Sequence, residues 1–475
     1  MNEQTDFERL VADQLGHAAV GAPPESAITE TIERAGGSRR LPEWLALIME
    51  SPMRTNSHLA VGSPTVRVLA ILGATLLLAL TLAAAGAGAQ RLMAAGGPIV
   101  VDQSGEGDYD TIGEAVAAAA DGDEVIVRPG TYAESVMIDK DLAVRGEGAA
   151  VLQAPEEGPT AITHGETADG ERYAMLLSDV SGSVEGLTFR GDHSLLIVSG
   201  GSPTVLDNVF DEVGFAFGTA GLSFDGSSIV LNRGTSAAVR GNTILDGGPI
   251  ATFGGASPTI EENVLEGGPH LFLTSDSDLI VRDNRITGTL VQGIGMYSSG
   301  NVLIEGNHFS DLTGIGINLD PDPVVPGVDL IVRDNTVAGA SRGIEIAQGA
   351  AAMVEGNTLT DNEAAVRSQG SSGRIAGNLL FDNRIGLSLI DYPGEITDNV
   401  IEGGGAGILI QGGSSLIDGN DVTGHSGRAI SIGGDSTATL TDNRSCDNGE
   451  NLWIADTAEP DIDDSNEICE DATTE

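Results

Sequence analysis

The sequence predicts an all-β fold, a right-handed parallel β-helix in which coils of about 22 residues stack into a solenoid, preceded by one transmembrane helix. Two observations predict the solenoid: a short phrase built on asparagine returns between Val205 and Asn443, and apolar residues hold fixed places around it. Eight of the ten gaps between successive asparagines are 21 to 23 residues long. A third observation, an apolar stretch of 22 residues upstream, predicts the membrane helix.

The repeating phrase places an asparagine directly after Asp, Gly or Glu, which is turn chemistry. The residue three positions before each asparagine is always apolar, and the residue two positions after it is apolar in all phrases but the last. Each phrase therefore predicts a strand, a tight turn at the asparagine and a second short strand. The asparagines are Asn208, Asn242, Asn263, Asn284, Asn307, Asn335, Asn357, Asn378, Asn399, Asn420 and Asn443.

A second alternating apolar run follows roughly nine to twelve residues after the asparagine in most coils. Several strands in about 22 residues leave no room for crossover helices, so equivalent strands of successive coils must pair as parallel sheets around one core. No row of Trp or Tyr is expected on the outward side of this second run. Its expected outward residues are Gly295, Gly316, Glu345, Arg367, Ser388, Leu409 and Ser431.

These repeats resemble those of the pectate-lyase-like superfamily, whose coils carry an inward row of asparagines at a turn. Amides about 4.8 Å apart on neighbouring strands can hydrogen-bond to one another, whereas an unpaired buried amide costs about 1–3 kcal/mol. We therefore expect a structural asparagine ladder. The passage that starts at Pro98 also resembles the entry of many β-helix proteins, with a capping helix over Thr111 to Ala120. Residues 98–450 are expected to form the β-helix, and 98–122 its N-terminal cap.

Upstream of the repeats, the stretch from Val68 to Ala89 has only two polar side chains, those of Thr75 and Thr81. A helix of this length reaches about 33 Å, enough to cross a hydrocarbon core of about 30 Å. Residues 67–90 therefore predict a transmembrane helix. Arginines near its ends favour an N-terminus inside the cell. Residues 1–66, a segment of unknown role, are then cytoplasmic, and the repeats lie outside the cytoplasm.

The two cysteines, Cys446 and Cys469, lie 23 residues apart, which is about the length of one coil. Outside the cytoplasm they could join the last coil to the acidic C-terminal tail, residues 451–475, through a disulfide. In a reducing compartment they would remain two free thiols. Cysteine usage therefore agrees with an exported solenoid without requiring one.

The formal net charge of −47 restricts the partners, and Lys140 is the one lysine. Such a surface repels nucleic acid, whose binding depends largely on contacts of Lys and Arg with phosphate. It would also repel acidic polysaccharide such as pectate unless divalent cations bridged the two. Solubility in a salty or acidic exterior explains the charge equally well.

Enzymes of the resembling superfamily act on an outward strand face, with carboxylates that hold calcium or serve as acid and base. Charged residues do occur two positions before the asparagines, and their signs alternate from coil to coil. An ion-pair ladder between neighbouring strands explains them without catalysis. These residues are Arg240, Glu261, Arg282, Glu305, Arg333 and Glu355.

Two longer gaps between asparagines are better candidates for function, because binding residues accumulate in the long loops of a solenoid. The gap of 28 residues contains Asp320 and Asp322, whose carboxylates could share a calcium ion with backbone oxygens. An ordinary acidic turn is the alternative. The gap of 34 residues contains Val213 to Gly234, a stretch with three phenylalanines.

The catalytic-aspartate phrase of pectin methylesterases and the paired-aspartate phrase of polygalacturonases are missing, so no catalytic residue is predicted. We expect a membrane-anchored extracytoplasmic β-helix protein that binds carbohydrate or another cell-envelope component, or serves as a rigid spacer. The alternative is a polysaccharide-active enzyme, a lyase, hydrolase or esterase that acts on acidic polysaccharide, with calcium as its candidate cofactor. A third hypothesis is an accessory protein resembling β-helix metalloenzyme-maturation factors, which would contain bound metal.

Overall fold

The structure is a computed structural model, and its described part begins after the predicted membrane helix. The N-terminal segment 1–66, the predicted transmembrane helix 67–90 and Asp322 lie outside the described residues. Within the described part, no helix has the length and apolar character needed to cross a bilayer. The described residues are 97–161, 171–192, 194–213, 226–268, 271–274, 276–289, 291–321 and 327–471.

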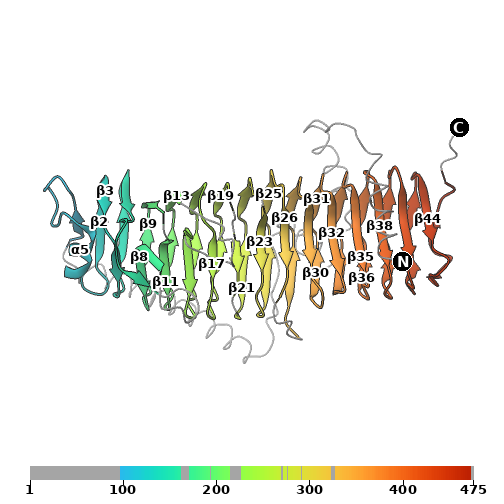
Figure 1. Cartoon of the computed structure of the whole chain (residues 1–475), viewed down its shortest axis with the longest axis horizontal. Helices are drawn as coiled ribbons and strands as arrows, with labels where there is room; N and C mark the ends of the chain where they lie inside the picture. Colours follow the sequence, from blue (N-terminus) through green and yellow to red (C-terminus); the bar gives the residue numbers. More distant parts are fainter. Residues whose placement is uncertain are drawn as a thin grey trace, which may run out of the picture. The chain divides into compact units, whose positions relative to one another are not determined.

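Three long sheets wind around one core, because each strand pairs in parallel with the equivalent strand one coil further on (Figure 1). We call them sheets A, B and C. Sheet A consists of β1 (Ile99–Val101), β2 (Glu124–Val127), β5 (Ala143–Gly146), β9 (Ser183–Glu185), β12 (Thr204–Leu206), β15 (Ala238–Arg240), β18 (Thr259–Glu261), β21 (Leu279–Arg282), β24 (Val302–Glu305), β27 (Leu330–Arg333), β30 (Ala351–Glu355), β33 (Ser372–Ala376), β36 (Glu395–Thr397), β39 (Leu416–Asp418), β42 (Thr439–Thr441) and β45 (Asp461–Ile462).

Sheet B holds the short strands that follow the asparagine turns. It consists of β3 (Gly130–Ala133), β6 (Ala150–Gln153), β10 (Thr188–Gly191), β13 (Val209–Val213), β16 (Thr243–Leu245), β19 (Val264–Glu266), β22 (Arg285–Thr287), β25 (His308–Ser310), β28 (Thr336–Ala338), β31 (Thr358–Thr360), β34 (Leu379–Phe381), β37 (Val400–Glu402), β40 (Asp421–Thr423), β43 (Arg444–Cys446) and β46 (Glu467–Ile468).

Sheet C holds the second strand run of each coil, and a short strand, β7 (Thr160–Ala161), pairs antiparallel with its second member. Sheet C consists of β4 (Val136–Ile138), β8 (Glu171–Ser178), β11 (Ser194–Ser199), β14 (Ile229–Asn232), β17 (Ile250–Thr252), β20 (Leu271–Leu273), β23 (Gln292–Met296), β26 (Ile315–Leu319), β29 (Arg342–Ile346), β32 (Ala364–Gln369), β35 (Ile385–Ile390), β38 (Ala406–Gln411), β41 (Arg428–Gly433) and β44 (Glu450–Ile454).

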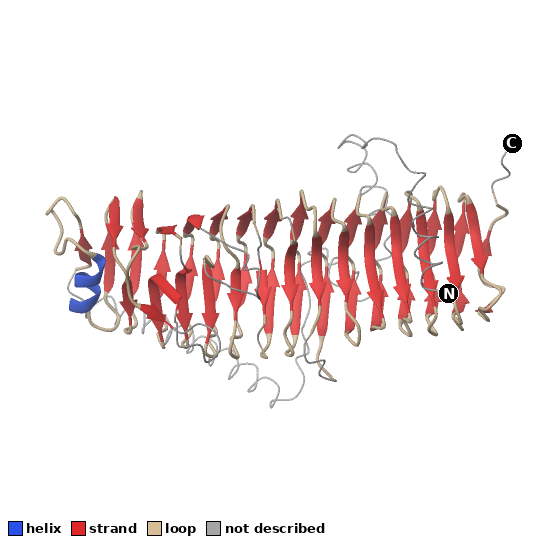
Figure 2. Cartoon of the chain, viewed as in Figure 1, coloured by secondary structure: helices blue, strands red, loops and turns tan. Residues whose placement is uncertain are grey.

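The predicted all-β parallel solenoid is confirmed, and strands account for most of the described chain (Figure 2). One coil contributes one strand to each sheet, as β21, β22 and β23 do in succession. Alternate side chains of these strands point inward, so Val281, Ile286 and Ile294 meet in the core with no exposed surface. Burying each such side chain contributes about 1.5–3 kcal/mol. A single coil cannot enclose these groups, so stability depends on stacking.

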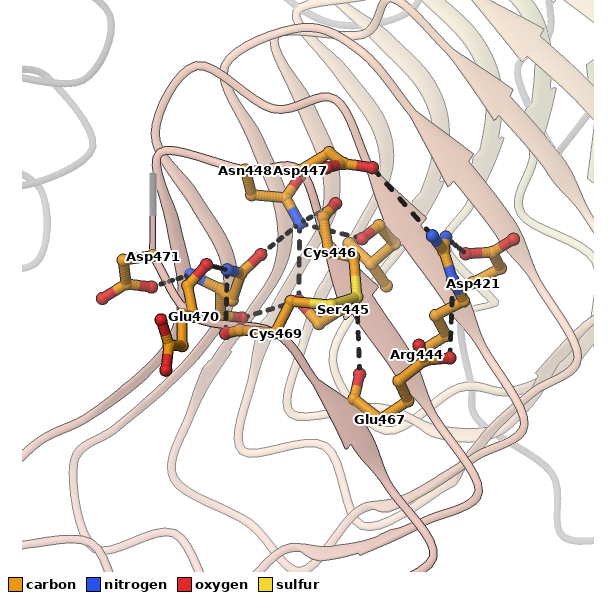
Figure 3. Close-up of a disulfide and its surroundings, with 12 residues drawn as sticks. Asp421, Arg444, Ser445, Cys446, Asp447, Asn448, Glu467, Cys469, Glu470 and Asp471 are labelled. Carbon is orange, nitrogen blue, oxygen red and sulfur yellow. Dashed lines mark hydrogen bonds and ion pairs between the residues drawn. A yellow bond between two sulfur atoms is a disulfide. The ribbon is translucent and has the colours of Figure 1, made fainter. Parts of the chain in front are cut away.

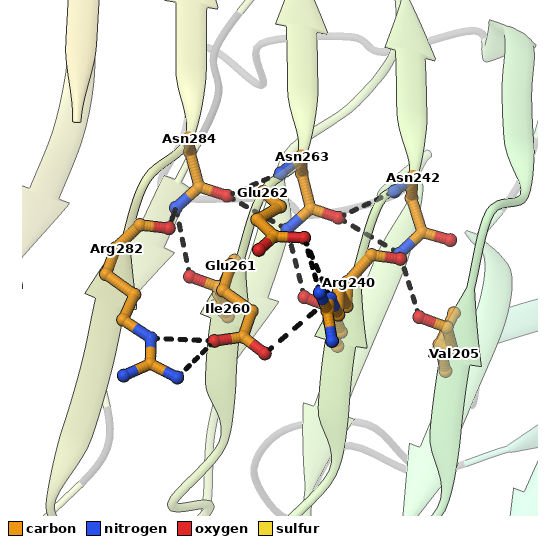
Figure 4. Close-up of polar contacts among 10 residues, drawn as sticks. Val205, Arg240, Asn242, Ile260, Glu261, Glu262, Asn263, Arg282 and Asn284 are labelled. Atoms are coloured by element: carbon orange, nitrogen blue, oxygen red, sulfur yellow. Dashed lines mark hydrogen bonds and ion pairs between the residues drawn. The ribbon is translucent and has the colours of Figure 1, made fainter. Parts of the chain in front are cut away.

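The asparagine ladder lies in the core, at the turn between sheets A and B (Figure 4). The backbone nitrogen and the side-chain nitrogen of Asn263 both donate to Oδ1 of Asn284, at 3.0 and 2.9 Å. Nδ2 of Asn263 also donates to the carbonyl oxygen of Val239 at 3.0 Å. All eleven predicted asparagines are at most 1% exposed. The ladder continues one coil further than predicted, because Nδ2 of Asn443 donates to Oδ1 of Asn466.

The residue before each ladder asparagine takes a left-handed backbone conformation, which explains the preference for Asp, Gly or Glu there. Asp283 and Glu262 both have φ near 55°. At Gly241, where φ is 65°, an added Cβ would lie 2.2 Å from Oδ1 of Asp207 in the preceding coil. A side chain at this position would therefore collide with the neighbouring turn as well as strain its own backbone.

A short helix, α5 (Ile112–Ala118), packs against the N-terminal coils of the solenoid, where the capping helix was predicted. Ile112 on its inner face is fully buried. The carboxylate of Glu134 accepts hydrogen bonds from the backbone at the start of the helix. Nζ of Lys140 donates to three carbonyl oxygens at its end, those of Val116, Ala117 and Ala119. The helix thus shields the apolar edge of the solenoid.

The solenoid extends beyond residue 450, the predicted start of an acidic tail. Strands β44, β45 and β46 continue sheets C, A and B by one more coil. Cys446 on β43 forms a disulfide with Cys469, which directly follows β46, with the Cα atoms 4.9 Å apart (Figure 3). The acidic composition of residues 451–475 concealed this coil, because its acidic side chains lie at the exposed surface while Asn466 takes the ladder position.

Candidate functional site

The outward face of sheet C is the candidate site, because its side chains change from aromatic to polar to charged along the solenoid axis. Parallel pairing puts one residue of each coil in register and forms what we call the outer row. The inward neighbours Ile294 and Met296 have no exposed surface, which fixes the phase of the row. From β23 to β44 the outer row is Gly295, Asn318, Glu345, Arg367, Ser388, Leu409, Ser431 and Trp453.

The predicted outward set was correct except on β26, where it was wrong by two residues. The sequence pattern placed Ile315 and Ile317 inward and Gly316 in the outer row. The structure turns Ile317 and Leu319 inward and gives the outer row Asn318, a polar residue that the sequence reasoning missed. Ile315, Ile317 and Leu319 alternate in one phase, so the sequence pattern left open whether Gly316 or Asn318 pairs with Gly295 of the neighbouring coil.

Aromatic side chains occupy the N-terminal part of this face. The rings of Phe272 on β20 and Tyr297, which follows β23, have centroids 4.9 Å apart and a tilt of 36°. They belong to an apolar cluster on the outer side of sheet C that also contains Ile197, Val230 and Phe253. The sequence analysis expected no row of Trp or Tyr on this face, and it missed two single aromatic side chains, those of Tyr297 and Trp453. Tyr297 lies immediately after its strand, and Trp453 is on the last strand of the sheet.

Amide side chains surround the hydroxyl of Tyr297. Nε2 of Gln292 donates to the Tyr297 hydroxyl at 3.1 Å, and Nδ2 of Asn318 donates to Oε1 of Gln292 at 3.5 Å. Gly295 makes this possible, because a Cβ at that position would lie 2.0 Å from Nε2 of Gln292. The missing side chain lets Gln292 lie along the sheet surface and reach the ring.

A charged group follows in the next two coils. Glu345 on β29 forms ion pairs with Arg342 on the same strand and with Arg367 on β32, the latter at 3.2 Å. The Glu345 side chain is only 18% exposed, whereas the two arginines are 37% and 33% exposed. One carboxylate therefore holds two guanidinium groups, which keep free N–H groups for another partner.

Together these side chains offer a stacking ring, two amides, a carboxylate and two guanidinium groups within four adjacent coils. An aromatic ring can stack on the C–H face of a sugar. Amides, carboxylates and guanidinium groups exchange hydrogen bonds with hydroxyl and carboxylate groups. The arrangement is suited to a hydroxyl-rich ligand that extends along the solenoid axis.

Comparison with known protein families agrees with the three-sheet geometry. Residues 175–359, 314–445 and 364–466 match the family described as right handed beta helix region, and together these ranges cover more than half of the chain. The chain belongs to this family. The fold implied by the resemblance to the pectate-lyase-like superfamily is thereby confirmed. No curated protein sequence matches the chain.

Solved β-helix structures are similar to this β-helix chain at low identity. The periplasmic alginate epimerase AlgG is 10% identical, with 70% of this chain and 78% of that chain covered and a TM-score of 0.39. The A-module of the Azotobacter vinelandii mannuronan C-5 epimerase AlgE4 is 13% identical, with 79% and 98% covered and a TM-score of 0.31. The GH87 α-1,3-glucanase of Streptomyces thermodiastaticus strain HF3-3 is 14% identical, with 78% and 70% covered and a TM-score of 0.31.

The predicted calcium ligands are only partly placed in this β-helix chain. Asp320 is exposed at the end of β26, in register with Tyr297 of the preceding coil, and Asp322 lies outside the described residues. Within the described ranges, Asp320 belongs to no group of three side chains that could hold a metal ion. The one such group found there is Cys446, Glu467 and Cys469, and its cysteines form the disulfide.

The alternating charges two positions before the asparagines form ion pairs on the outward face of sheet A. The guanidinium of Arg282 contacts the carboxylate of Glu261 at 2.5 Å (Figure 4). That of Arg333 contacts Glu305 at 2.7 Å. The hydrogen bond that Arg282 donates to Glu261 raises the pKa of Arg282 above its ordinary value. These pairs are exposed and satisfied by one another, which favours the structural interpretation over a catalytic one.

The structure contains a second amide ladder that the sequence analysis missed. It lies five residues after the main ladder, where the backbone nitrogen and Nδ2 of Asn362 both donate to Oδ1 of Asn383, at 3.0 and 2.9 Å. His425 takes the equivalent position two coils later, and its backbone nitrogen donates to Oδ1 of Asn448 at 2.8 Å. The constant offset from the main asparagines was the signal in the sequence.

Proposed function

We propose that this β-helix protein binds a linear polysaccharide on the outward face of sheet C. The observation that supports this most is the aromatic ring of Tyr297 beside Gln292 and Asn318, continuous with Glu345 and Arg367 in the outer row. A sugar placed on the ring would find amide partners on the same strand and the next one, and charged partners two to three coils further on. Parallel pairing repeats this spacing at about 4.8 Å, so a polymer can contact several coils at once.

The test is binding by the full chain to soluble oligosaccharides of glucose and of galacturonic acid, measured by calorimetry. Tyr297→Ala removes the ring from the proposed site. Arg333→Ala is the control, because it removes a partly exposed side chain from the outward face of sheet A. We expect Tyr297→Ala to weaken binding about tenfold, which is about 1.4 kcal/mol of stacking and hydrogen bonding, and the control to bind normally. Equal binding by wild type and Tyr297→Ala would overturn the assignment of the face.

A polysaccharide-active enzyme is the second candidate, favoured by the hydrogen bond between the Tyr297 hydroxyl and Gln292. In an acidic polysaccharide, a phenolic base could take the proton next to the sugar carboxylate. The electron pair would then form the C=C double bond as the glycosidic C–O bond breaks, and the phenol would return the proton to the leaving sugar oxygen. Amide or guanidinium donors would then stabilise the negative charge that develops. Tyr297→Phe should then abolish unsaturated products while leaving binding intact. Asp320 adds calcium as a candidate cofactor, and product formation that survives a chelator would argue against that role.

We further propose that the solenoid works outside the cytoplasm, anchored by residues 67–90, where a cell-envelope component or polysaccharide is its partner and nucleic acid is not. The disulfide between Cys446 and Cys469 supports this location, because such bonds persist in oxidising compartments. Maleimide labelling of intact cells with and without reductant provides the test. Labelling of the native protein without reductant, or protection of the solenoid from external protease, would contradict the proposal.

A further inference from the structure

Trp453 stands at the C-terminal end of the outer row, on the last strand of sheet C. Its register partner is Ser431 on β41, so it occupies the same row as Asn318 and Glu345. Seven strand steps separate β44 from β23, the strand next to Tyr297. At about 4.8 Å per step this distance is about 34 Å.

The indole ring is held in place by charged neighbours. The guanidinium carbon of Arg428 lies 3.9 Å from the centroid of the Trp453 ring. Nε of Arg428 donates to Oε2 of Glu450 at 2.9 Å, and the Arg428 side chain is only 17% exposed. A cation held over an aromatic ring in this way fixes the orientation of both groups. The ring is therefore ordered before any ligand arrives, which lowers the entropy cost of binding.

On one side of this ring there is no further strand of sheet C within the described part of the chain. Arg428 and Gly433, which approach the ring, both belong to β41, the preceding strand of the sheet. Sheet C ends at β44 among the described residues. Trp453 is partly exposed, and among the described residues no further strand of sheet C covers the ring face turned away from β41. Arg428 occupies the other face, and its ion-pair partner Glu450 lies on the same strand as Trp453. A rigid aromatic ring with a carboxylate and a guanidinium group nearby can bind a sugar, because the ring stacks on its C–H face and the charged groups hydrogen-bond to its hydroxyl groups.

We propose that Trp453, with Arg428 and Glu450, is a second sugar-binding position at the far end of the sheet C face. This inference rests on the proposed polysaccharide binding at Tyr297 and adds its direction and length. The glycan runs parallel to the solenoid axis and contacts about one coil per sugar residue, because an extended sugar unit is about as long as the spacing between strands, about 4.8 Å. A chain of about eight sugars then reaches from Tyr297 to Trp453, whereas a chain of two or three contacts only one end.

The fluorescence of Trp453 gives a direct readout of this position. The sequence has two tryptophans, so Trp44→Phe in the full chain leaves Trp453 as the single emitter. Oligosaccharides of glucose and of galacturonic acid, each in short form and in a form of about eight units, are titrated into this protein. For the type of oligosaccharide that binds, glucose or galacturonic acid, we expect the long form to change the emission of Trp453. In calorimetry, Trp453→Ala should weaken the long form by about five- to tenfold.

Two controls separate this inference from the proposed function. Tyr297→Ala should weaken both short and long forms, whereas Trp453→Ala should affect mainly the long form. A long oligosaccharide that binds, depends on Tyr297 and leaves both the emission and the affinity at Trp453 unchanged would overturn the second position but not the first. If no oligosaccharide binds, both proposals fall. Trp453→Phe keeps a ring against Arg428, so recovery of most of the affinity would exclude misfolding as the cause.

Discussion

The effect of acid on the second amide ladder is the sharpest test of how this core is built, and it centres on His425. Nε2 of His425 lies 3.2 Å from the carbonyl oxygen of Ile401. Two coils earlier Nδ2 of Asn383 donates to the equivalent carbonyl, that of Leu359. Histidine thus replaces asparagine as a donor. Its Nδ1 has no hydrogen-bond partner and the residue is only 3% exposed. Burial lowers the pKa of His425 from 6.5 to about 4.

The direction of the pH effect follows from these values. Below about pH 6.5 the unfolded chain takes up a proton at His425, whereas the folded chain resists protonation until about pH 4. Folded-state stability is therefore complete above about pH 6.5 and falls as the pH drops toward 4. A pKa shift of this size lowers the free energy of unfolding by about 3 kcal/mol as the pH falls from about 6.5 to about 4.

The variant His425→Asn removes the titrating group and keeps the donor. The new amide can donate to the Ile401 carbonyl, and its oxygen can accept from the coil before, as Asn383 accepts from Asn362. Urea unfolding followed by circular dichroism is measured for both proteins at about pH 7 and about pH 4.5. Between these two pH values we expect the free energy of unfolding of the wild type to fall by about 1–3 kcal/mol more than that of the variant. The carboxylates act equally in both proteins and cancel. Equal losses would refute the buried, neutral histidine.

Three further predictions concern stability and the binding face. Asn335→Leu should cost at least about 2 kcal/mol in urea unfolding, because it leaves buried partners of the ladder unpaired. Arg333→Ala should cost much less, and the reverse order would mean that the inward and outward sides are misassigned. Cys469→Ser should lower stability by about 3 kcal/mol, the loop-closure value for 23 residues; no change between reducing and oxidising buffer would contradict this. Gly295→Ala should displace Gln292 and weaken glycan binding with little change in melting temperature, since the added Cβ displaces the flexible end of Gln292 and presses on the Tyr297 ring by only a few tenths of an ångström; unchanged affinity would count against this group as a contact.

Much of the repeating structure could be predicted from the sequence, because each coil contains the same pattern of asparagine, turn residue and apolar positions. The spacing of residues such as Asn263 and Asn284 sets the coil length, and the apolar positions around them set which side faces the core. The places where the chain departs from the repeat were harder to predict. The exposed acidic side chains of the last coil hid the strands beyond residue 450, and the alternating apolar residues around Ile317 allowed two registers with the preceding coil.

The sequence by itself determined the fold and the asparagine ladder, because a period of about 22 residues is visible along the chain and identical side chains in successive coils must meet. The tertiary structure alone decided the candidate binding face. Gln292, Tyr297 and Asn318 follow no period, and Trp453 lies far from them in sequence. They share one face only because parallel pairing brings one residue of every coil into register. The absence of a side chain at Gly295 then lets two of them touch.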